Sequence, residues 1–419
     1  MNQGSIACLW TALPQHCPAP CDRYKHASCA HRGHVYLLGG REKCSLRDFW
    51  KYNVACNTWA ELPCHCEEAP EELEEHTMVG HQGFLYVFGG MPDSAYSNSK
   101  IPLWVFDTVS ECWINWKTGI ETVQGTTPAN RKGHSAVTFG SCMYVYGGYV
   151  DIRGSTKDLW KFNLDYKVWS QLSHVKGGPG PRHGHSAITH QDCMYIYGGL
   201  QGLREQKDLW KWSSTSQTWS FIKCYSGPSK LVGHTAVLFK ESMLVYGGGE
   251  THSSPQNSLW SFNLTTMTWK KLPLLTGSTS PCRIHHCSVG LGPGFQPTAP
   301  HSVHSREIPN SHNINNKRRP FKNKCLPTSQ ENGIELQTLE PENSKCLPDF
   351  SIALKEAKIK GSCLTFENQE AVNEKWNSDH LGEETEDAML LHLPDLLLVL
   401  GGKPLQGQHG ISVWHMTMA

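Results

Sequence analysis

Residues 142–148 read CMYVYGG, and residues 193–199 read CMYIYGG. In both stretches, aromatic and β-branched residues run directly into a pair of glycines. Such side chains suit a buried strand, and glycine tolerates the positive φ that a sharp exit from a strand requires. The two stretches therefore predict short buried strands that each end in a tight turn.

The same combination of an apolar run and a glycine pair occurs six times in the chain. A fixed unit of roughly 50 residues is typical of a repeat architecture, in which each unit is one supersecondary element. The six glycine pairs are Gly39-Gly40, Gly89-Gly90, Gly147-Gly148, Gly198-Gly199, Gly247-Gly248 and Gly401-Gly402.

Histidines and tryptophans keep regular distances from the first five glycine pairs. A histidine lies thirteen residues before the first glycine, and two tryptophans nine residues apart follow the pair. The variable distance falls between the glycines and the first tryptophan, so we expect a loop that tolerates insertion there. The histidines are His26, His76, His134, His185 and His234, and the tryptophan pairs are Trp50/Trp59, Trp104/Trp113, Trp160/Trp169, Trp210/Trp219 and Trp260/Trp269.

Each unit is interpreted as four short strands, and a sheet of this size cannot bury both of its faces alone. The units must therefore stack around an axis. The glycine doublets and the spaced tryptophans resemble the kelch repeat over roughly residues 1–291 and 391–419. This resemblance implies an all-β, six-bladed kelch β-propeller.

The sixth unit is interrupted, and its last strand is expected at the other end of the chain. Leu9-Trp10-Thr11-Ala12-Leu13-Pro14 matches Thr58-Trp59-Ala60-Glu61-Leu62-Pro63. We therefore expect Trp10 to supply the fourth strand of blade six, which closes the ring and removes its exposed sheet edges. An open or five-bladed arrangement is the alternative. The expected boundaries are residues 1–291 for blades one to five, the closing strand and the start of blade six, and residues 391–419 for its remainder.

Residues 292–390 differ in composition from the repeats. They are rich in Pro, Asn, Ser, Glu and Lys, which is typical of a disordered insertion, here within blade six. The basic stretch of residues 317–324 is either a nuclear import signal or a solvated charge run in a loop. Residues 351–360 are compatible with a short helix.

The balance of charge excludes some classes of partner. The chain has 38 Lys+Arg and 38 Asp+Glu, so we expect neither nucleic acid nor a membrane surface as partner. No apolar run approaches the ~20 residues that span a bilayer, and residues 1–13 lack a secretory pattern. The 17 cysteines are an odd number and several lie in apolar strands, which favours free thiols in a reducing compartment. We expect a cytoplasmic location, with the nucleus as a second one.

No metal or cofactor is expected. The recurring histidines, with His286, occupy equivalent places in different blades, so they are interpreted as structural residues that satisfy buried polar groups. Two sets have zinc-ligand residue types without the spacing of a zinc site. The resemblance also includes copper-dependent oxidases, which makes a kelch-type enzyme the alternative function, although no ligand set for copper is recognisable. The two sets are Cys282, His285, His286 and Cys287, and Cys17, Cys21, His26 and Cys29.

The residue three positions before each histidine is the candidate for ligand binding. It is arginine in four units and leucine, at Leu73 and Leu231, in the other two. In kelch-type substrate adaptors of ubiquitin ligases, matching arginines hold acidic peptide groups. The resemblance thus implies a substrate-recognition or scaffold subunit, without a visible BTB or F-box sequence, that binds an acidic peptide or a C-terminal carboxylate at the channel mouth. Alternatively, the arginines pair with Asp48, Asp158 or Asp208. The four are Arg23, Arg131, Arg182 and Arg283.

Overall fold

The structure is a computed structural model in which part of the chain is described. It separates into one unit of residues 1–300 and 379–419 and a second unit of residues 301–378. All described residues belong to the first unit, so the fold below is that of this unit alone. Most of the predicted insertion, with the basic stretch 317–324 and the helix candidate 351–360, lies outside the described residues. These are 7–92, 102–116, 127–172, 177–251, 253–296, 394–406 and 410–418.

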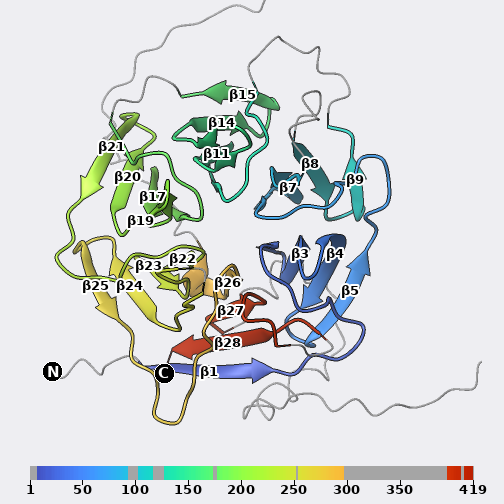
Figure 1. Cartoon of the computed structure of the whole chain (residues 1–419). Helices are drawn as coiled ribbons and strands as arrows, with labels where there is room; N and C mark the ends of the chain where they lie inside the picture. The colour runs from blue at the N-terminus through green and yellow to red at the C-terminus, as the bar shows by residue number, and fades with distance from the viewer. Residues whose placement is uncertain are drawn as a thin grey trace, which may run out of the picture. The chain divides into compact units, whose positions relative to one another are not determined.

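Six four-stranded antiparallel sheets form a ring, which confirms the predicted six-bladed propeller (Figure 1). The innermost strand of each sheet contacts the innermost strands of both neighbouring sheets, and the last of them, β26, contacts the first, β2. The ring is therefore closed around a central channel. The innermost strands are β2 (Ala27–His31), β6 (Thr77–His81), β10 (Ser135–Phe139), β16 (Ser186–His190), β22 (Thr235–Phe239) and β26 (Cys287–Leu291).

The second strand of each blade is the apolar run that defines the repeat, and its side chains are almost completely buried. The third and fourth strands carry the two tryptophans on the outer side of the sheet. The second strands are β3 (His34–Arg41), β7 (Phe84–Phe88), β11 (Cys142–Tyr146), β17 (Cys193–Tyr197), β23 (Ser242–Tyr246) and β27 (Leu396–Leu400); the third are β4 (Ser45–Asn53), β8 (Leu103–Asp107), β14 (Leu159–Asn163), β20 (Leu209–Ser213), β24 (Leu259–Asn263) and β28 (Val413–Met418); the fourth are β5 (Thr58–Leu62), β9 (Cys112–Ile114), β15 (Val168–Gln171), β21 (Thr218–Ile222), β25 (Thr268–Lys271) and β1 (Cys8–Leu13).

The N-terminal strand β1 closes blade six, as the sequence predicted. It pairs with β28 in antiparallel register from Cys8 opposite Met418 to Leu13 opposite Val413. The indole of Trp10 is buried and stacks on the ring of Tyr246 in blade five, with the ring centroids 4.5 Å apart. The strand therefore holds blade six together and also packs it against the preceding blade.

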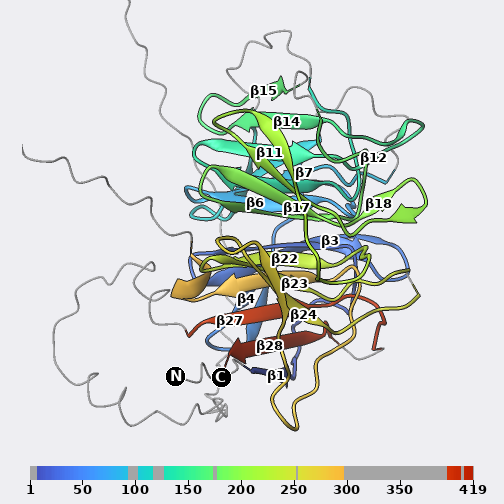
Figure 2. The same cartoon turned by 90° about the vertical axis from the view of Figure 1, so that its left-hand side faces the viewer.

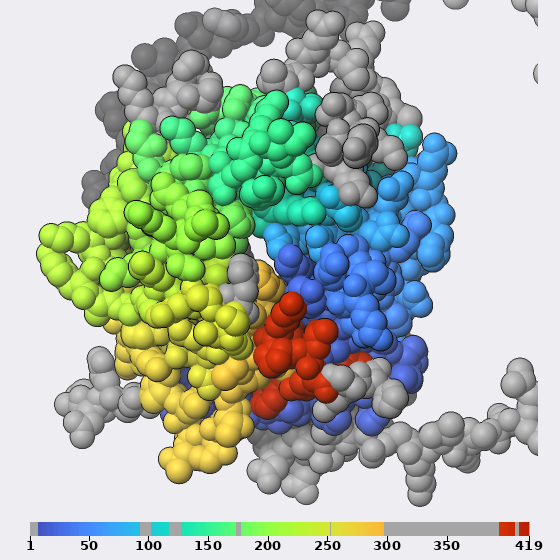
Figure 3. All heavy atoms as spheres, viewed as in Figure 1, coloured from blue at the N-terminus to red at the C-terminus, as the bar shows by residue number. Residues whose placement is uncertain are grey.

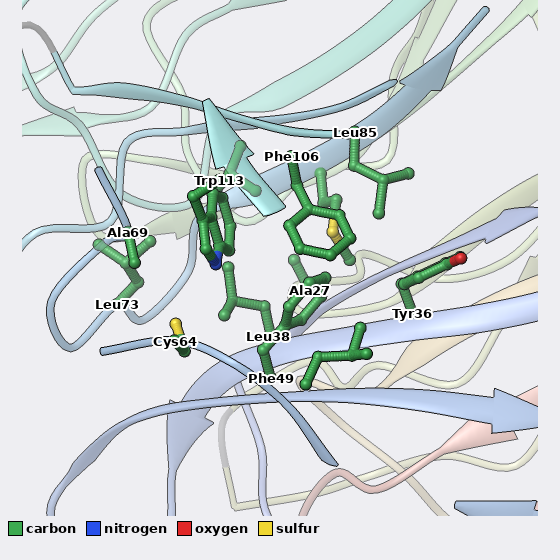
Figure 4. Close-up of a cluster of buried hydrophobic side chains, with 13 residues drawn as sticks. Ala27, Tyr36, Leu38, Phe49, Cys64, Ala69, Leu73, Leu85, Phe106 and Trp113 are labelled. Atoms are coloured by element: carbon green, nitrogen blue, oxygen red, sulfur yellow. The ribbon is translucent and has the colours of Figure 1, made fainter. Parts of the chain in front are cut away.

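The hydrophobic core is divided into clusters that lie between neighbouring blades. Figure 4 shows the cluster between blades one and two, where Leu38 and Phe49 face Leu85 and Phe106. The rings of Phe49 and Phe106 meet edge to face, with their centroids 4.8 Å apart. Burial of each such side chain contributes roughly 1.5–3 kcal/mol. Because each blade buries its faces against two neighbours, the blades depend on one another for stability.

Two additional hairpins extend the connections between the second and third strands of blades three and four. Figure 2 shows β12 and β18 on the same side of the propeller. We call this side the lead-in face, because the segments that lead into the innermost strands also lie there. The hairpins are β12 (Tyr149–Val150) with β13 (Gly154–Ser155), and β18 (Leu200–Gln201) with β19 (Arg204–Glu205).

The short 3-10 helix η2 (Pro293–Phe295) follows β26 and packs on the propeller, although the sequence placed its residues in the insertion. The backbone N–H of Gly294 donates to Asp395 Oδ1 at 2.6 Å, and the ring of Phe295 lies against that of Phe239. The two points where the chain leaves and re-enters the described blade are therefore joined by a hydrogen bond.

Two further observations concern the described residues only. The fourteen cysteines among them are free thiols. No helix in this part of the chain has the length and apolar character needed to cross a bilayer.

Candidate functional site

The four candidate arginines lie in the lead-in segments and are buried, with at most 3 % of each residue exposed. Arg23 donates to both carboxylate oxygens of Asp48 at 2.6 Å, and Arg182 donates to both oxygens of Asp208 at 2.8 Å. Burial alone would raise the pKa of each aspartate, but the hydrogen bonds from its arginine hold that pKa below the ordinary value. These are bidentate charge-assisted contacts.

The other two arginines are held less tightly. Arg131 Nη2 lies 3.7 Å from Asp158 Oδ2, and burial lowers the pKa of Arg131 to about 10. Arg283 donates to the hydroxyl of Ser412 at 2.9 Å, and this serine occupies the place of the aspartate in blade six. The four positions are thus equivalent in the sequence but differ in their counter-charge.

The arginines also join neighbouring blades. The guanidinium of Arg182 donates to the carbonyl of Gly198 in its own blade at 2.9 Å. In the opposite direction, the N–H of Gly148 in the preceding blade donates to the carbonyl of Arg182 at 2.8 Å. The contacts with Asp48, Asp158 and Asp208 are those of the structural alternative. Direct contact of the arginines with a ligand stays a prediction.

The recurring histidines form a second layer of contacts between blades. Each is buried, and burial lowers the pKa values, to about 3 for His26 and His76 and to about 4 for His234. Four of them share a hydrogen bond with a hydroxyl group on the innermost strand of the preceding blade, which agrees with the structural interpretation. These pairs are His134 with Thr77, His185 with Ser135, His234 with Ser186, and His286 with Thr235.

The residue directly before each histidine forms a closed ring around the channel, which the sequence analysis did not identify. All six residues have positive φ, between 55° and 64°, and each backbone N–H donates to the carbonyl of the equivalent residue in the preceding blade at 2.7–3.1 Å. This conformation favours glycine, and glycine in three lead-in segments was the available signal. In blade order the residues are Lys25, Glu75, Gly133, Gly184, Gly233 and His285.

We call the opening that these six residues surround the channel mouth. Figure 3 shows the hollow at the centre of the lead-in face. A cavity of about 270 Å³ lies here and includes His183 in its lining. The mouth is asymmetric, because blades three, four and five contribute only glycine to the ring, whereas blades six, one and two contribute His285, Lys25 and Glu75. One half of the ring therefore has no side chains, and the other half carries ionisable groups.

The charged half contains a tight ion pair. Lys25 Nζ lies 2.6 Å from Glu75 Oε1, and both side chains are partly exposed. Burial opposes the charged form of each, but their attraction raises the pKa of Lys25 and lowers that of Glu75. Glu74 is held between Arg41 and Lys132, at 3.4 Å from each. The mouth therefore presents both cationic donors and carboxylate acceptors to the channel.

The opposite end of the channel has a different character. A cavity of about 370 Å³ there is lined largely by apolar residues of the innermost strands, such as Val79, Val137 and Ile188, and by Phe295. Within the described ranges, no group of three or more His, Cys, Asp or Glu side chains is placed to hold a metal ion. The two candidate zinc sets are therefore not assembled by the residues that the structure describes.

The comparisons with known proteins agree with this architecture. A family model described as the KLHDC2/KLHL20/DRC7 Kelch-repeats domain matches residues 6–122 and 115–293. Kelch domain-containing protein 3 of Rattus norvegicus is 29% identical over 199 residues, 45% of this chain and 50% of that protein. Kelch domain-containing protein 10 of Xenopus laevis is 30% identical over 208 residues, 47% of this chain and 48% of that protein.

Host cell factor 2 of Homo sapiens is 28% identical over 240 residues, 47% of this chain and 29% of that protein. The chain thus spans half or less of the length of these curated relatives.

Proposed function

The chain belongs to the kelch-repeat family of β-propellers, and we propose that it acts as a protein-interaction module that binds a segment of a partner protein at the channel mouth. Within this proposal, it serves as a substrate-recognition or scaffold subunit in the cytoplasm or nucleus. The observation that carries the proposal is the asymmetric ring, in which three neighbouring glycines leave space beside a lysine–glutamate pair.

The chemistry of the mouth suits a peptide segment with a carboxylate. Lys25 has three N–H donors, of which Glu75 accepts one, and a ligand carboxylate would accept from another. Glu75 in turn accepts N–H groups of a peptide backbone. A charge-assisted hydrogen bond of this kind contributes roughly 1.5–3 kcal/mol. We therefore propose an acidic peptide or a C-terminal carboxylate as the ligand, in line with the resemblance to kelch-type substrate adaptors.

In this proposal the four arginines act mainly beneath the ligand. Their guanidinium groups fix the glycine turns and the lead-in segments that build the mouth, and Arg131 is the one whose aspartate lies farthest away. Among the three arginines that pair with an aspartate, Arg131 would therefore lose the least by turning to a ligand carboxylate, and Arg283 donates only to neutral groups such as the Ser412 hydroxyl. Arg23 and Arg182 are committed to bidentate pairs.

The test selects binders from a library of random peptides displayed with free C-termini, and measures them by fluorescence polarisation. Each selected peptide is compared with its C-terminal amide and with a version whose Asp and Glu are Asn and Gln. We expect one of these changes to weaken binding at least tenfold. Lys25→Ala should abolish that difference, whereas Lys51→Ala, which removes a similar ion pair with Glu111 elsewhere, should preserve it.

Two outcomes would contradict the proposal: a library without binders, or peptides that bind equally well after both changes. Metal analysis of the same preparation addresses the oxidase alternative, because stoichiometric copper would be incompatible with a pure interaction module.

A further inference from the structure

We propose that the two hairpins β12–β13 and β18–β19 form a second interaction surface, separate from the channel mouth, for a folded partner protein. The partner would receive the hairpin tips in an apolar cleft of its own that is rimmed by carboxylates. The two most exposed large apolar side chains in the described part of the chain are at their tips. Leu203 is 96 % exposed and Ile152 is 92 % exposed. Neither side chain buries appreciable apolar surface against the propeller.

The backbone of the first tip is strained. Ile152 has a φ of 69°, and it is the only β-branched residue among the described non-glycine residues with positive φ. A β-branched side chain disfavours this region, and such strain persists at sites where function requires it. Glycine or asparagine would suit the turn better. An exposed, strained isoleucine therefore points to a contact that the isolated chain does not make.

The second hairpin repeats the chemistry of the first. Ile152 is followed by Arg153, and Leu203 is followed by Arg204, and all four side chains are exposed. Over residues 149–157 and 200–207 there are four basic and two acidic side chains, a net charge of +2, although the whole chain is neutral. The local charge favours a partner surface rich in Asp and Glu.

The two hairpins are held side by side. The ring of Tyr149 meets His183 edge to face, with the centroids 5.7 Å apart, and Ser155 Oγ lies 2.8 Å from His183 Nδ1. The backbone of His183 in turn pairs with Leu200 at the base of the second hairpin. Two convex apolar tips at a fixed spacing fit a concave partner better than an extended peptide, which supports a folded protein as the occupant.

The experiment places a photo-cross-linking amino acid at position 203 of the full-length protein in cells, and at Tyr166 as the control. Tyr166 is 77 % exposed and belongs to blade three, next to the blade that carries Leu203. It lies in the turn after β14, on the face of the propeller opposite the lead-in face. We expect a defined cross-linked partner from position 203 and none of it from position 166. The purified partner should then bind the wild-type chain directly.

The decisive variant is Ile152→Gly, which removes the side chain and relieves the backbone strain. We expect it to melt at the same temperature as the wild type or higher, yet to lose at least tenfold in affinity for the partner. The double variant Arg153→Glu with Arg204→Glu should also weaken binding, and more so at low salt. Tyr166→Ala should bind as the wild type does.

Several results would overturn this inference. An equal yield of the cross-linked partner from position 166, or an undiminished affinity of Ile152→Gly, would show that the hairpin tips do not bind the partner. A cross-linked product that is a second copy of this chain would identify a different occupant. A membrane would be the occupant if the wild type, but not Ile152→Gly, sedimented with vesicles of 70 % phosphatidylcholine and 30 % phosphatidylserine. The variant Lys25→Ala, which removes the proposed ligand donor of the channel mouth and leaves the contacts of His183 with both hairpins in place, should keep the cross-link, so the two surfaces are tested independently.

Discussion

At the scale of single residues, the direction of the side chain decides whether each of the four arginines can serve structure or ligand binding. The sequence allowed either a ligand contact or a pairing with Asp48, Asp158 or Asp208, because spacing places a residue in its segment of the repeat but does not identify the partner of its side chain. In the structure the guanidinium groups turn into the blades. The ring residue two positions further along, which lines the channel mouth, was not predictable from the sequence, because its residue type changes from blade to blade.

Replacement of Arg182 by alanine is expected to destabilise the propeller. It removes the donor of the Gly198 carbonyl and leaves Asp208 with the indole N–H of Trp210, at 2.6 Å, in place of its charged partner. A broken buried ion pair costs about 3–5 kcal/mol; because 23 % of the Asp208 side chain is exposed, we expect about 3 kcal/mol. Arg131→Ala should cost less, since its pair spans 3.7 Å and 36 % of the Asp158 side chain is exposed, which weakens the ion pair. Urea denaturation of both variants measures this. Unchanged stability together with lost peptide binding would show that these arginines serve the ligand instead.

The buried histidines predict an acid-sensitive fold. Burial holds their folded-state pKa values low, near 3 for His26 and His76 and near 4 for His234, while the unfolded value is about 6.5. Below pH 6.5 the unfolded chain binds protons that the folded chain does not, so stability falls with falling pH by about 1.4 kcal/mol per pH unit for each histidine. The contribution is fully present above pH 6.5; it decreases down to about pH 4 for His234 and down to about pH 3 for His26 and His76.

Urea midpoints at pH 7.5, 6.0 and 5.0 check this expectation. His234→Asn should make the dependence on pH shallower by about one histidine's share, whatever its effect on stability at pH 7.5. A midpoint that stays constant between pH 7.5 and 5.0 would contradict the burial of neutral imidazoles.

At the scale of elements, the strands and their order were predictable from the sequence. The fixed nine-residue offset between tryptophans identified third and fourth strands, and the match of Trp10 to Trp59 located the closing strand β1 at the other end of the chain. The sheet orders of blades one to five confirm the first prediction, and the order β1-β28-β27-β26 of blade six confirms the second. The hairpins β12–β13 and β18–β19 were missed, because each strand has only two residues and carries no periodicity.

Deletion of residues 1–14 is expected to destabilise the protein severely. It exposes the edge of β28 and removes Trp10 from its stack on Tyr246. Loss of a buried tryptophan alone costs about 3–5 kcal/mol, which is comparable with the stability of many domains. Thermal melting should show a large decrease or aggregation. The point variant Trp10→Ala should reproduce much of the loss, whereas Leu9→Ala, whose side chain is 39 % exposed, should melt close to the wild type.

An unchanged melting curve after deletion of residues 1–14 would contradict closure by β1. The same comparison would then favour the open arrangement that the sequence left as the alternative.

At the scale of the whole molecule, the number of blades followed from counting repeats, but the character of the channel did not. The ring of backbone hydrogen bonds arises only when six lead-in segments meet, and no segment carries it alone. Glycine at three neighbouring positions, Gly133, Gly184 and Gly233, leaves one half of the ring without side chains, and these glycines line the cavity of about 270 Å³; this half is called the open half. The central claim is therefore that this open half is where a partner segment binds.

The measurement that tests this claim most directly is the affinity of the selected peptides for Gly133→His. His285 occupies the equivalent place in blade six with a φ of 55°, so the ring backbone is compatible with a histidine. A Cβ at Gly133 would lie 3.1 Å from Gly184 N and 3.3 Å from Glu75 Oε2, so these neighbours must shift slightly and the new imidazole stands directly beside the charged half of the mouth. The control is Gly140→His, since Gly140 has a similar φ of 57° on the opposite face and a Cβ there would meet nothing within 4 Å. Both variants should melt cooperatively. We predict that Gly133→His binds the peptides at least tenfold more weakly, about 1.4 kcal/mol, while Gly140→His binds them as the wild type does; equal affinity of both variants would contradict the claim.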